Sequence, residues 1–231
     1  MICTAKIRNI LFDFDGTLMD SSEGVAAAFS ALGKHYGISI PPETCRKMIG
    51  PPLPYSLVHI LGFAPEQAEE AMEVYRRAYA GEGMFLASVY PGIPGLLQRL
   101  HQAGRKLFVA TSKPEVYARQ ILEKKGLARW FTFTGGSDLA ETERAEKADV
   151  IRYVLETCGL DPAECLMAGD RKYDVLGAAA NGVQTAGVLY GFGSREELES
   201  AGAAFLCATP GELGDRILAD AGCNPDGGAP A

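Results

Sequence analysis

The 231-residue sequence contains no long apolar run: none reaches the roughly 18 consecutive residues that a membrane-spanning helix needs. Its first residues, Met1–Thr4, lead directly into a strand-like stretch and leave no room for a secretory signal. The six cysteines form no Cys-x-x-Cys pair, and none of the three histidines lies near a cysteine at ligand spacing, which argues against structural zinc. These absences predict a cytoplasmic protein with reduced thiols and no membrane partner.

Positive charge is also scarce, because 22 Lys and Arg stand against 29 Asp and Glu and give a net charge of −7. This balance disfavours nucleic acid as a partner, since phosphate backbones are bound by clustered basic side chains. It leaves room for a small anionic substrate, because a local cation can reverse the field inside one pocket. Whether the protein is a monomer or a homodimer stays open.

The pattern from residue 91 onward alternates between strand and helix. Short apolar runs are typical of buried parallel strands, and apolar residues at a spacing of three or four indicate helices between them. Strands separated by helices predict right-handed crossovers and a doubly wound, Rossmann-like parallel α/β sheet. The expected strands are Leu107–Ala110, Phe131–Phe133, Cys165–Ala168, Thr185–Leu189 and a short one at Phe205, and the expected helices are Ile93–Leu100, Ala118–Leu122, Val150–Cys158, Val175–Asn181, Glu196–Ala201 and Gly211–Ala221.

The region between the first strand, Ile10–Phe12, and residue 85 differs because it contains helical patterns only. These patterns cover Val25–Tyr36, Tyr55–Leu61 and Pro65–Tyr79. We therefore expect a small all-helical cap inserted after the first strand. The predicted domains are an α/β core formed by residues 1–19 and 86–222, a helical cap formed by residues 20–85, and a disordered tail at residues 223–231, which is rich in Gly and Pro.

Two carboxylates follow the first strand in the stretch Asp13-Phe14-Asp15-Gly16-Thr17. Residues two apart on an extended chain point to the same side, and two buried carboxylates side by side require a cation or a shared proton. Gly16 lets the chain leave the strand with permissive torsions. Ordinary turn chemistry is the alternative explanation for Asp-Gly-Thr.

A second acidic pair, Asp170 and Asp174, follows the strand Cys165–Ala168. At a spacing of four the two carboxylates share one helix face, although acids are also common at helix N-termini for capping reasons alone. Ligands of open α/β sheets bind beyond the carboxyl ends of the strands, where both pairs would meet. Oxygen-only ligation favours magnesium over zinc.

Hydroxyl and basic side chains add a candidate anion site. Thr111 and Ser112 end another strand and precede Lys113 at a helix entrance, where free backbone N–H groups favour anions. Simple N-capping explains these hydroxyls equally well. Lys147 opens a later helix, where a cation opposes the helix dipole unless an anion lies nearby; neighbouring glutamates are the alternative partners. Charge alone does not decide whether Lys113 shares the role of Lys147.

The order of these motifs resembles the haloacid dehalogenase superfamily over nearly the whole chain, to about residue 220. Its pattern of Asp-x-Asp-Gly-Thr, Thr/Ser, Lys and Gly-Asp-x-x-x-Asp reads here as Asp13–Thr17, Thr111, Lys147 and Gly169–Asp174. The helical insert resembles the C1 cap of that superfamily. Each motif by itself is weak evidence for the superfamily, but four motifs in the same order along the chain are specific evidence.

The resemblance implies a magnesium-dependent phosphatase. Asp13 would be the nucleophile that takes the phosphoryl group, and Asp15 the general acid for the leaving alkoxide and then the base for water. Thr111 and Lys147 would hold the phosphoryl oxygens. An acyl-phosphate intermediate splits one difficult step into two easier ones.

The same resemblance places Mg²⁺ on the Asp13 side chain, the Asp15 backbone carbonyl and Asp170, with Asp174 as a ligand or as support for one. The metal would offset the repulsion between the Asp13 carboxylate and a phosphate dianion. In this superfamily dehalogenases need no acid at the position of Asp15, and transfer ATPases carry Thr there. Asp15 therefore points to a hydrolase or a phosphomutase.

Finer resemblance suggests the phosphoglycolate phosphatase branch, and similar bacterial proteins are described as 5'-nucleotidases. It rests on Ile49–Leu53, Ala110–Pro114 and Gly187–Ser194. We expect a small phosphorylated metabolite as substrate. The candidate substrate-binding residues are Gly16, Ser112, Lys113, Arg46, Gly50, Pro51 and Leu53, although Ile49–Leu53 could be only a helix-ending turn and Arg46 a solvated charge.

Three alternatives to a phosphatase follow from the same residues. A β-phosphoglucomutase-like enzyme would convert a hexose phosphate into its isomer and release little phosphate. A response-regulator receiver also gathers Asp, Thr/Ser and Lys near magnesium, but receivers are much shorter and lack a helical insert. An inactive, substrate-binding member of the superfamily is the third alternative.

Overall fold

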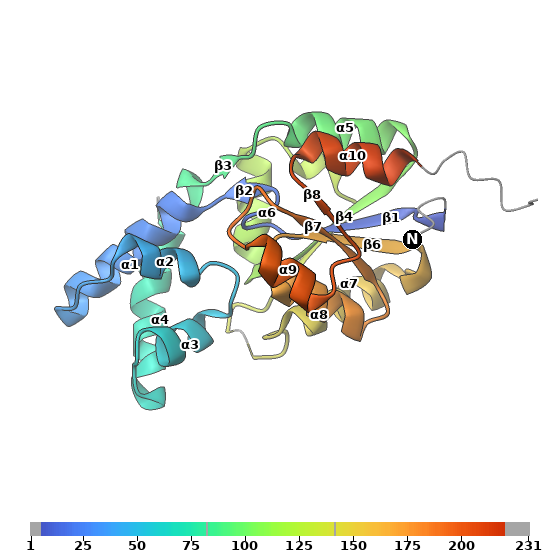
Figure 1. Ribbon diagram of the computed structural model, residues 1–231. Coiled ribbons are helices and arrows are strands. Elements are labelled where there is room, and N and C mark those ends of the chain that lie inside the picture. Colours follow the sequence, from blue (N-terminus) through green and yellow to red (C-terminus); the bar gives the residue numbers. More distant parts are fainter. Residues whose placement is uncertain (1–5, 82, 141, 220–231) are drawn as a thin grey trace, which may run out of the picture.

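The computed structural model describes residues 6–81, 83–140 and 142–219 of the chain. Its main sheet has six parallel strands in the order β5-β4-β1-β6-β7-β8 (Figure 1). From the central strand β1 the order runs outward to β4 and β5 on one side and to β6, β7 and β8 on the other. Where the strand order changes direction in this way, a crevice lies beyond the carboxyl ends of the strands. The strands are β1 (Asn9–Phe12), β4 (Lys106–Pro114), β5 (Phe133–Ser137), β6 (Cys165–Gly169), β7 (Gln184–Val188) and β8 (Phe205–Cys207).

Helices cover both faces of this sheet, so the central strands are buried on both sides. In β1, Ile10 and Phe12 belong to the core on one face and Leu11 to the core on the other, as the two-residue period of a strand requires. In Figure 1, α5 and α10 lie over one face, and α7, α8 and α9 lie under the other. Apolar residues of α6 join the core of the α5 and α10 face. These helices are α5 (Ile93–Gln102), α6 (Glu115–Lys124), α7 (Lys147–Cys158), α8 (Lys172–Ala180), α9 (Arg195–Ala201) and α10 (Pro210–Leu218), and 3₁₀ turns lie at Ala128–Trp130 and Pro162–Glu164.

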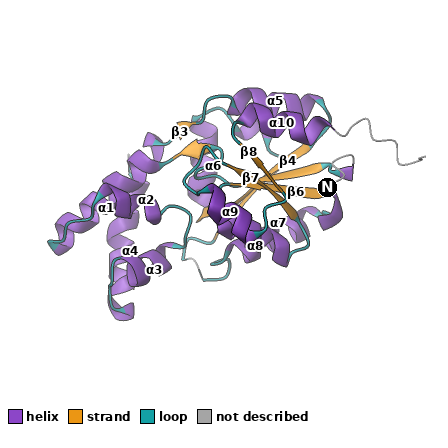
Figure 2. Cartoon of the chain, viewed as in Figure 1, coloured by secondary structure: helices purple, strands orange, loops and turns teal. Residues whose placement is uncertain are grey.

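The remaining helices lie to one side of the sheet (Figures 1 and 2). The chain enters this part through β2 (Met19–Asp20) and leaves it through β3 (Ser88–Val89), which pair antiparallel over two residues each. Inside it, the Phe29 and Tyr75 rings pack at 4.6 Å between centroids. The division into core and cap domains stays a prediction. The helices are α1 (Ser22–Tyr36), α2 (Pro42–Lys47), α3 (Leu53–Tyr55), the π-helix η2 (Ser56–Ile60), α4 (Pro65–Ala80) and the 3₁₀ helix η3 (Gly83–Leu86).

The sheet follows the predicted doubly wound α/β class, but one strand is displaced from its expected position. The strand predicted at Phe131–Phe133 is β5, which begins at Phe133 and runs to Ser137. Gly135 and Gly136 mark close approaches within the sheet. A Cβ on Gly135 would lie 2.4 Å from Val154 Cγ2, and one on Gly136 would lie 2.5 Å from the Lys113 carbonyl oxygen.

Two short elements were also missed by the helical and strand patterns, namely α2 and the β2–β3 pair. Each is too short to produce a clear periodicity. The helix expected at Tyr55–Leu61 is split into α3 and the π-helix η2. The end of the helix expected at Gly211–Ala221 and the tail predicted to be disordered at residues 223–231 lie outside the described residues. Within the described ranges, none of the helices combines the length and apolarity that a membrane crossing requires.

The close contact at Gly135 gives a stability prediction. Gly135→Ala should lower the free energy of unfolding by about 1–3 kcal/mol, because the new methyl group overlaps Val154 in a packed core. Gly95→Ala in α5 is the matched control: a Cβ there meets no atom within 4 Å, so the change should raise stability by about 0.5–1 kcal/mol. Urea unfolding of both variants measures the difference, and equal stabilities would contradict the packing argument.

Candidate active site

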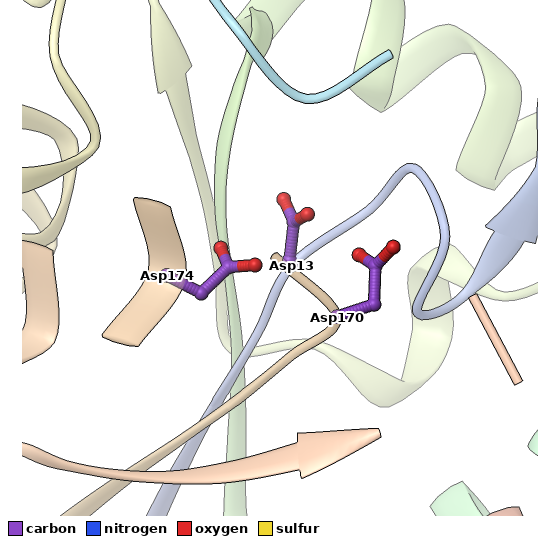
Figure 3. A group of neighbouring side chains, drawn as sticks. All are labelled: Asp13, Asp170 and Asp174. Atoms are coloured by element: carbon purple, nitrogen blue, oxygen red, sulfur yellow. The ribbon is translucent and has the colours of Figure 1, made fainter. Parts of the chain in front are cut away.

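Three buried aspartates meet at the carboxyl ends of neighbouring strands. Asp13 follows β1, Asp170 follows β6, and Asp174 lies in the first turn of α8. One carboxylate oxygen from each lies within 4.8 Å of the others, and Figure 3 shows the three side chains gathered there. Their exposed fractions are 4%, 0% and 1%. The structure therefore brings Asp13 of the first acidic pair together with both residues of the second pair, while Asp15 belongs to a separate charged group.

The charges in this group are only partly compensated. Lys147 Nζ lies 2.5 Å from Asp13 Oδ1 and 2.9 Å from Asp174 Oδ1, and it donates to the Ala110 carbonyl at 3.1 Å. Burial, followed by the charge of Asp174, raises the pKa of Asp13 to about 7 despite Lys147. Burial and the charges of Asp174 and Asp13 raise the pKa of Asp170 well above its usual range. Three carboxylates around one ammonium group leave a surplus of negative charge.

Asp170 is enclosed by glycine-containing loops. The Phe192 backbone N–H donates to its Oδ2 at 2.7 Å, and the Thr17 hydroxyl lies 3.4 Å from its Oδ1. A Cβ on Gly16 would lie 2.2 Å from Asp170 Oδ2, and one on Gly191 would lie 2.4 Å from Asp170 Cβ. The missing side chains allow both loops to close around the carboxylate. Gly16, predicted as a substrate-binding residue, thus packs against an acid.

The acidic group fits a hard divalent cation. Its donors are carboxylate oxygens only, which suit Mg²⁺ better than the soft or nitrogen-rich sets of transition metals. Asp174 already has both oxygens engaged, one with Lys147 and the other as acceptor from the Arg171 backbone N–H at 3.0 Å. Lys147 contacts Asp13 through Oδ1 alone, and the contact of Asp170 Oδ1 with the Thr17 hydroxyl is long at 3.4 Å, so these two carboxylates have more capacity for direct ligation than Asp174.

A second charged group surrounds Asp15. Lys113 Nζ lies 3.0 Å from Asp15 Oδ2 and 2.6 Å from the Tyr79 hydroxyl oxygen. Asp15 Oδ1 is buried, and it has no hydrogen-bond partner among the residues that the structure describes. The Thr111 hydroxyl accepts the Lys113 backbone N–H at 3.1 Å within the irregular end of β4, where the register shifts between Thr111 and Pro114. The two predicted lysines thus have different partners.

Residues of both groups line one cavity: Asp13 and Lys147 from the first group, and Asp15 and Lys113 from the second. Its catalytic end holds six of the predicted residues: Asp13, Asp15, Thr111, Ser112, Lys113 and Lys147. Its opposite wall includes the predicted Gly50, Pro51 and Leu53. Arg46 is not among the lining residues; it is exposed, with its guanidinium 5.9 Å from the Phe192 ring centroid.

The aromatic part of this cavity was not found from the sequence. Phe29, Tyr75, Tyr79 and Tyr117 line it, and successive ring centroids along this series are 4.6, 5.7 and 5.9 Å apart. The one available signal was the spacing of Tyr75 and Tyr79, which places both on the same face of α4. That spacing is equally typical of a helix packed in a core. Val25, Met48, Ile49, Arg76 and Pro114 complete the lining.

Comparison with known proteins identifies relatives over most of the chain. A family model described as haloacid dehalogenase-like hydrolase matches residues 10–188. A 5'-nucleotidase of Pseudomonas aeruginosa is 42% identical over 204 residues, covering 88% of this chain and 92% of the relative. A crystal structure of a predicted phosphatase from Clostridium acetobutylicum is 41% identical, with a TM-score of 0.89, and covers 92% of this chain and 99% of its own.

More distant relatives carry different names. Tyrosine-protein kinase PtkA of Mycobacterium tuberculosis is 36% identical over 191 residues, covering 82% of this chain and 65% of the relative. Phosphoglycolate phosphatase 1 of P. aeruginosa is 32% identical over 196 residues, covering 80% of this chain and 70% of the relative. Although the names differ, the family match includes strands of the main sheet as well as the helical insert. It favours a hydrolase over the receiver module that was considered from the sequence. The chain belongs to the haloacid dehalogenase-like hydrolase family.

Proposed function

We propose that the protein is a magnesium-dependent phosphatase that hydrolyses a small phosphomonoester through an aspartyl-phosphate on Asp13. The observation that carries this proposal is that Asp13 and Lys147 line a cavity, while two further buried carboxylates, Asp170 and Asp174, lie beside Asp13. Membership of the hydrolase family and the names of the phosphatase relatives support it.

In this proposal Asp13 attacks the phosphorus atom, forming a P–O bond while the bond to the leaving oxygen breaks. Lys147 holds the Asp13 carboxylate through its 2.5 Å contact, and Lys147 and Thr111, which line the same cavity, would bind phosphoryl oxygens. A bound Mg²⁺, held by Asp13, Asp170 and the Asp15 backbone carbonyl, would reduce the repulsion between the carboxylate and the phosphate dianion.

Asp15 supplies the proton chemistry in both halves of the reaction. Its Oδ1 is the oxygen free of hydrogen bonds within the described part of the chain, so it gives a proton to the leaving alkoxide. In the second half the same oxygen takes a proton from water, which attacks the aspartyl-phosphate. Phosphate leaves, and both carboxyl groups return to their starting states.

The cavity wall favours a leaving group with a flat, apolar part. Three cationic side chains line the cavity, Lys113, Lys147 and Arg76, and the two lysines lie at hydrogen-bond distance from Asp15 and Asp13. The rest of the opposite wall is largely aromatic and aliphatic. Such a wall suits stacking of a nucleobase better than the carboxylate of glycolate. We therefore propose a nucleoside 5'-monophosphate type of substrate rather than phosphoglycolate.

Removing the nucleophile tests the chemistry. Asp13→Asn should lower kcat for p-nitrophenyl phosphate at least on the order of 10³-fold, because the amide cannot form the covalent intermediate. Chelation of divalent metal should also abolish turnover, and added Mg²⁺ should restore it. Full activity in EDTA, or in Asp13→Asn, would rule out the proposal. Formation of a sugar phosphate isomer with little free phosphate would instead indicate the phosphomutase.

The raised pKa of Asp13 predicts how metal binding depends on pH. The pKa of Asp13 in the folded protein, about 7, exceeds its ordinary value of 3.8, so protonation of Asp13 stabilises the metal-free protein fully below about pH 4. That contribution is lost as pH rises through about 7. Mg²⁺ competes with the proton, so the rise in Tm produced by Mg²⁺ should be larger at about pH 8 than at about pH 5.5.

Differential scanning calorimetry with and without Mg²⁺ measures this effect. Asp170→Asn should reduce the Mg²⁺-dependent shift, whereas Asp215→Asn should retain it, because Asp215 lies in α10 and pairs with Arg99 at 2.6 Å. A shift that is the same at both pH values would contradict competition between the metal and the proton.

Substrate preference is tested at the aromatic wall. Tyr75→Ala should lower kcat/KM for a nucleoside 5'-monophosphate by about 5- to 150-fold, the range expected when one stacking partner of about 1–3 kcal/mol is lost. Phosphoglycolate is the internal control, because damage to the fold would slow both substrates, while loss of stacking slows only the nucleotide. Wild-type preference for phosphoglycolate would refute the proposed leaving group.

A further inference from the structure

Tyr79, Lys113 and Asp15 form a chain of polar contacts between the helical insert and the catalytic end of the cavity. Tyr79 lies in the last turn of α4 and is 3% exposed. Its hydroxyl accepts a hydrogen bond from Lys113 Nζ at 2.6 Å, and the same ammonium lies 3.0 Å from Asp15 Oδ2. Three distant segments of the chain therefore meet at one buried cation.

We propose that Lys113 is a positioning residue for the proton donor Asp15, and that Tyr79 makes this positioning depend on the placement of α4. The inference rests on the proposed function and deepens it. It also resolves whether Lys113 duplicates Lys147: Lys147 serves the nucleophile, and Lys113 serves the acid. Neither this division nor the part of Tyr79 could be derived from the sequence.

The two oxygens of Asp15 are distinguished by these contacts. Lys113 holds Oδ2, which fixes the rotation of the carboxyl group, while Oδ1 stays buried without a hydrogen-bond partner in the described chain. An oriented Oδ1 is the atom that must reach the leaving oxygen, and proton transfer requires that the two heavy atoms approach within hydrogen-bond distance. Losing Lys113 would free the carboxyl group to rotate and would leave it without its charge partner.

Tyr79 holds Lys113 in two ways. Its hydroxyl accepts one ammonium hydrogen, and the ammonium also lies 4.6 Å from the centroid of the Tyr79 ring, within cation–π range. Tyr79 is further packed against Tyr75 and Tyr117, so its position depends on how α4 sits over α6. Displacement of α4 would remove Tyr79 from Lys113 and would loosen the orientation of Asp15. Protonation of a poor leaving group is thereby coupled to the placement of the insert.

The test compares two leaving groups in the first turnover. Release of p-nitrophenolate needs little protonation, whereas release of an alkoxide from a nucleoside 5'-monophosphate needs the proton of Asp15. Quenched-flow measurement of the first turnover isolates formation of the aspartyl-phosphate from its hydrolysis, in which Asp15 acts again. The quantity of interest is the ratio of the two rates in each variant, relative to the wild-type protein.

Lys113→Met should lower the first-turnover rate with the nucleotide on the order of 100-fold, the size of a general-acid contribution, and the rate with p-nitrophenyl phosphate only a few-fold. Tyr79→Phe keeps the ring and removes only the hydroxyl, so it should show the same selectivity with a loss of about tenfold. Because Tyr79→Phe preserves packing, it keeps the test decisive if Lys113→Met fails to fold.

Matched controls lie outside the cavity. Lys124→Met removes an ammonium that lies 3.8 Å from the Phe85 ring centroid, and Tyr153→Phe removes a hydroxyl from a ring packed against Phe133. Both should leave the ratio of the two rates unchanged. Equal losses with both substrates in Lys113→Met and Tyr79→Phe would overturn the inference and make Lys113 a phosphate ligand. Unchanged rates would overturn it in favour of a purely structural ion pair.

Failure of the inference is distinct from failure of the proposed function. If the wild-type protein releases no p-nitrophenol from p-nitrophenyl phosphate, or if Asp13→Asn still releases it, the phosphatase mechanism is wrong. The positioning role of Lys113 is then wrong as well. If the wild-type protein shows a first turnover that needs Asp13 but the variants show no substrate selectivity, only the role of Tyr79 and Lys113 is lost.

Discussion

The structure of this site depends on the mutual repulsion of carboxylates that the fold holds together out of water. Asp13, Asp170 and Asp174 would ionise poorly as a group without nearby positive charge, and the raised pKa of Asp13 and Asp170 expresses this cost. Lys147 compensates part of it from the start of α7. The remaining imbalance is the physical reason that the site fits a divalent cation and, beside it, a phosphoryl group.

Two buried lysines divide the positive charge of the cavity between two tasks. Lys147 lies with Asp13, and Lys113 lies with Asp15, each at hydrogen-bond distance. Separate partners keep the nucleophile and the proposed proton donor in distinct electrostatic surroundings although they are only two residues apart in the chain.

Much of this arrangement could be predicted because it is local to strand ends. Asp13 and Asp170 follow short apolar strands, so their meeting follows from parallel topology alone. The aromatic wall could not be predicted in the same way, because the place of Tyr79 depends on how α4 packs against α6, which no periodicity encodes. The strand β5 was misplaced because its apolar signal ends at Phe133, while Gly135 belongs to the strand for a tertiary reason, its close contact with Val154.

The antiparallel pair β2–β3 has a consequence for how such an enzyme could acquire new substrates. All of α1 to α4 is inserted between two strands of two residues each, while the acids and both lysines lie on loops and elements of the main sheet. Replacing the insert by one of another size would change most of the apolar wall and leave the carboxylates at the strand ends undisturbed. Selectivity and reactivity can therefore diverge independently during evolution, with Tyr79 as a point at which a new insert must restore contact.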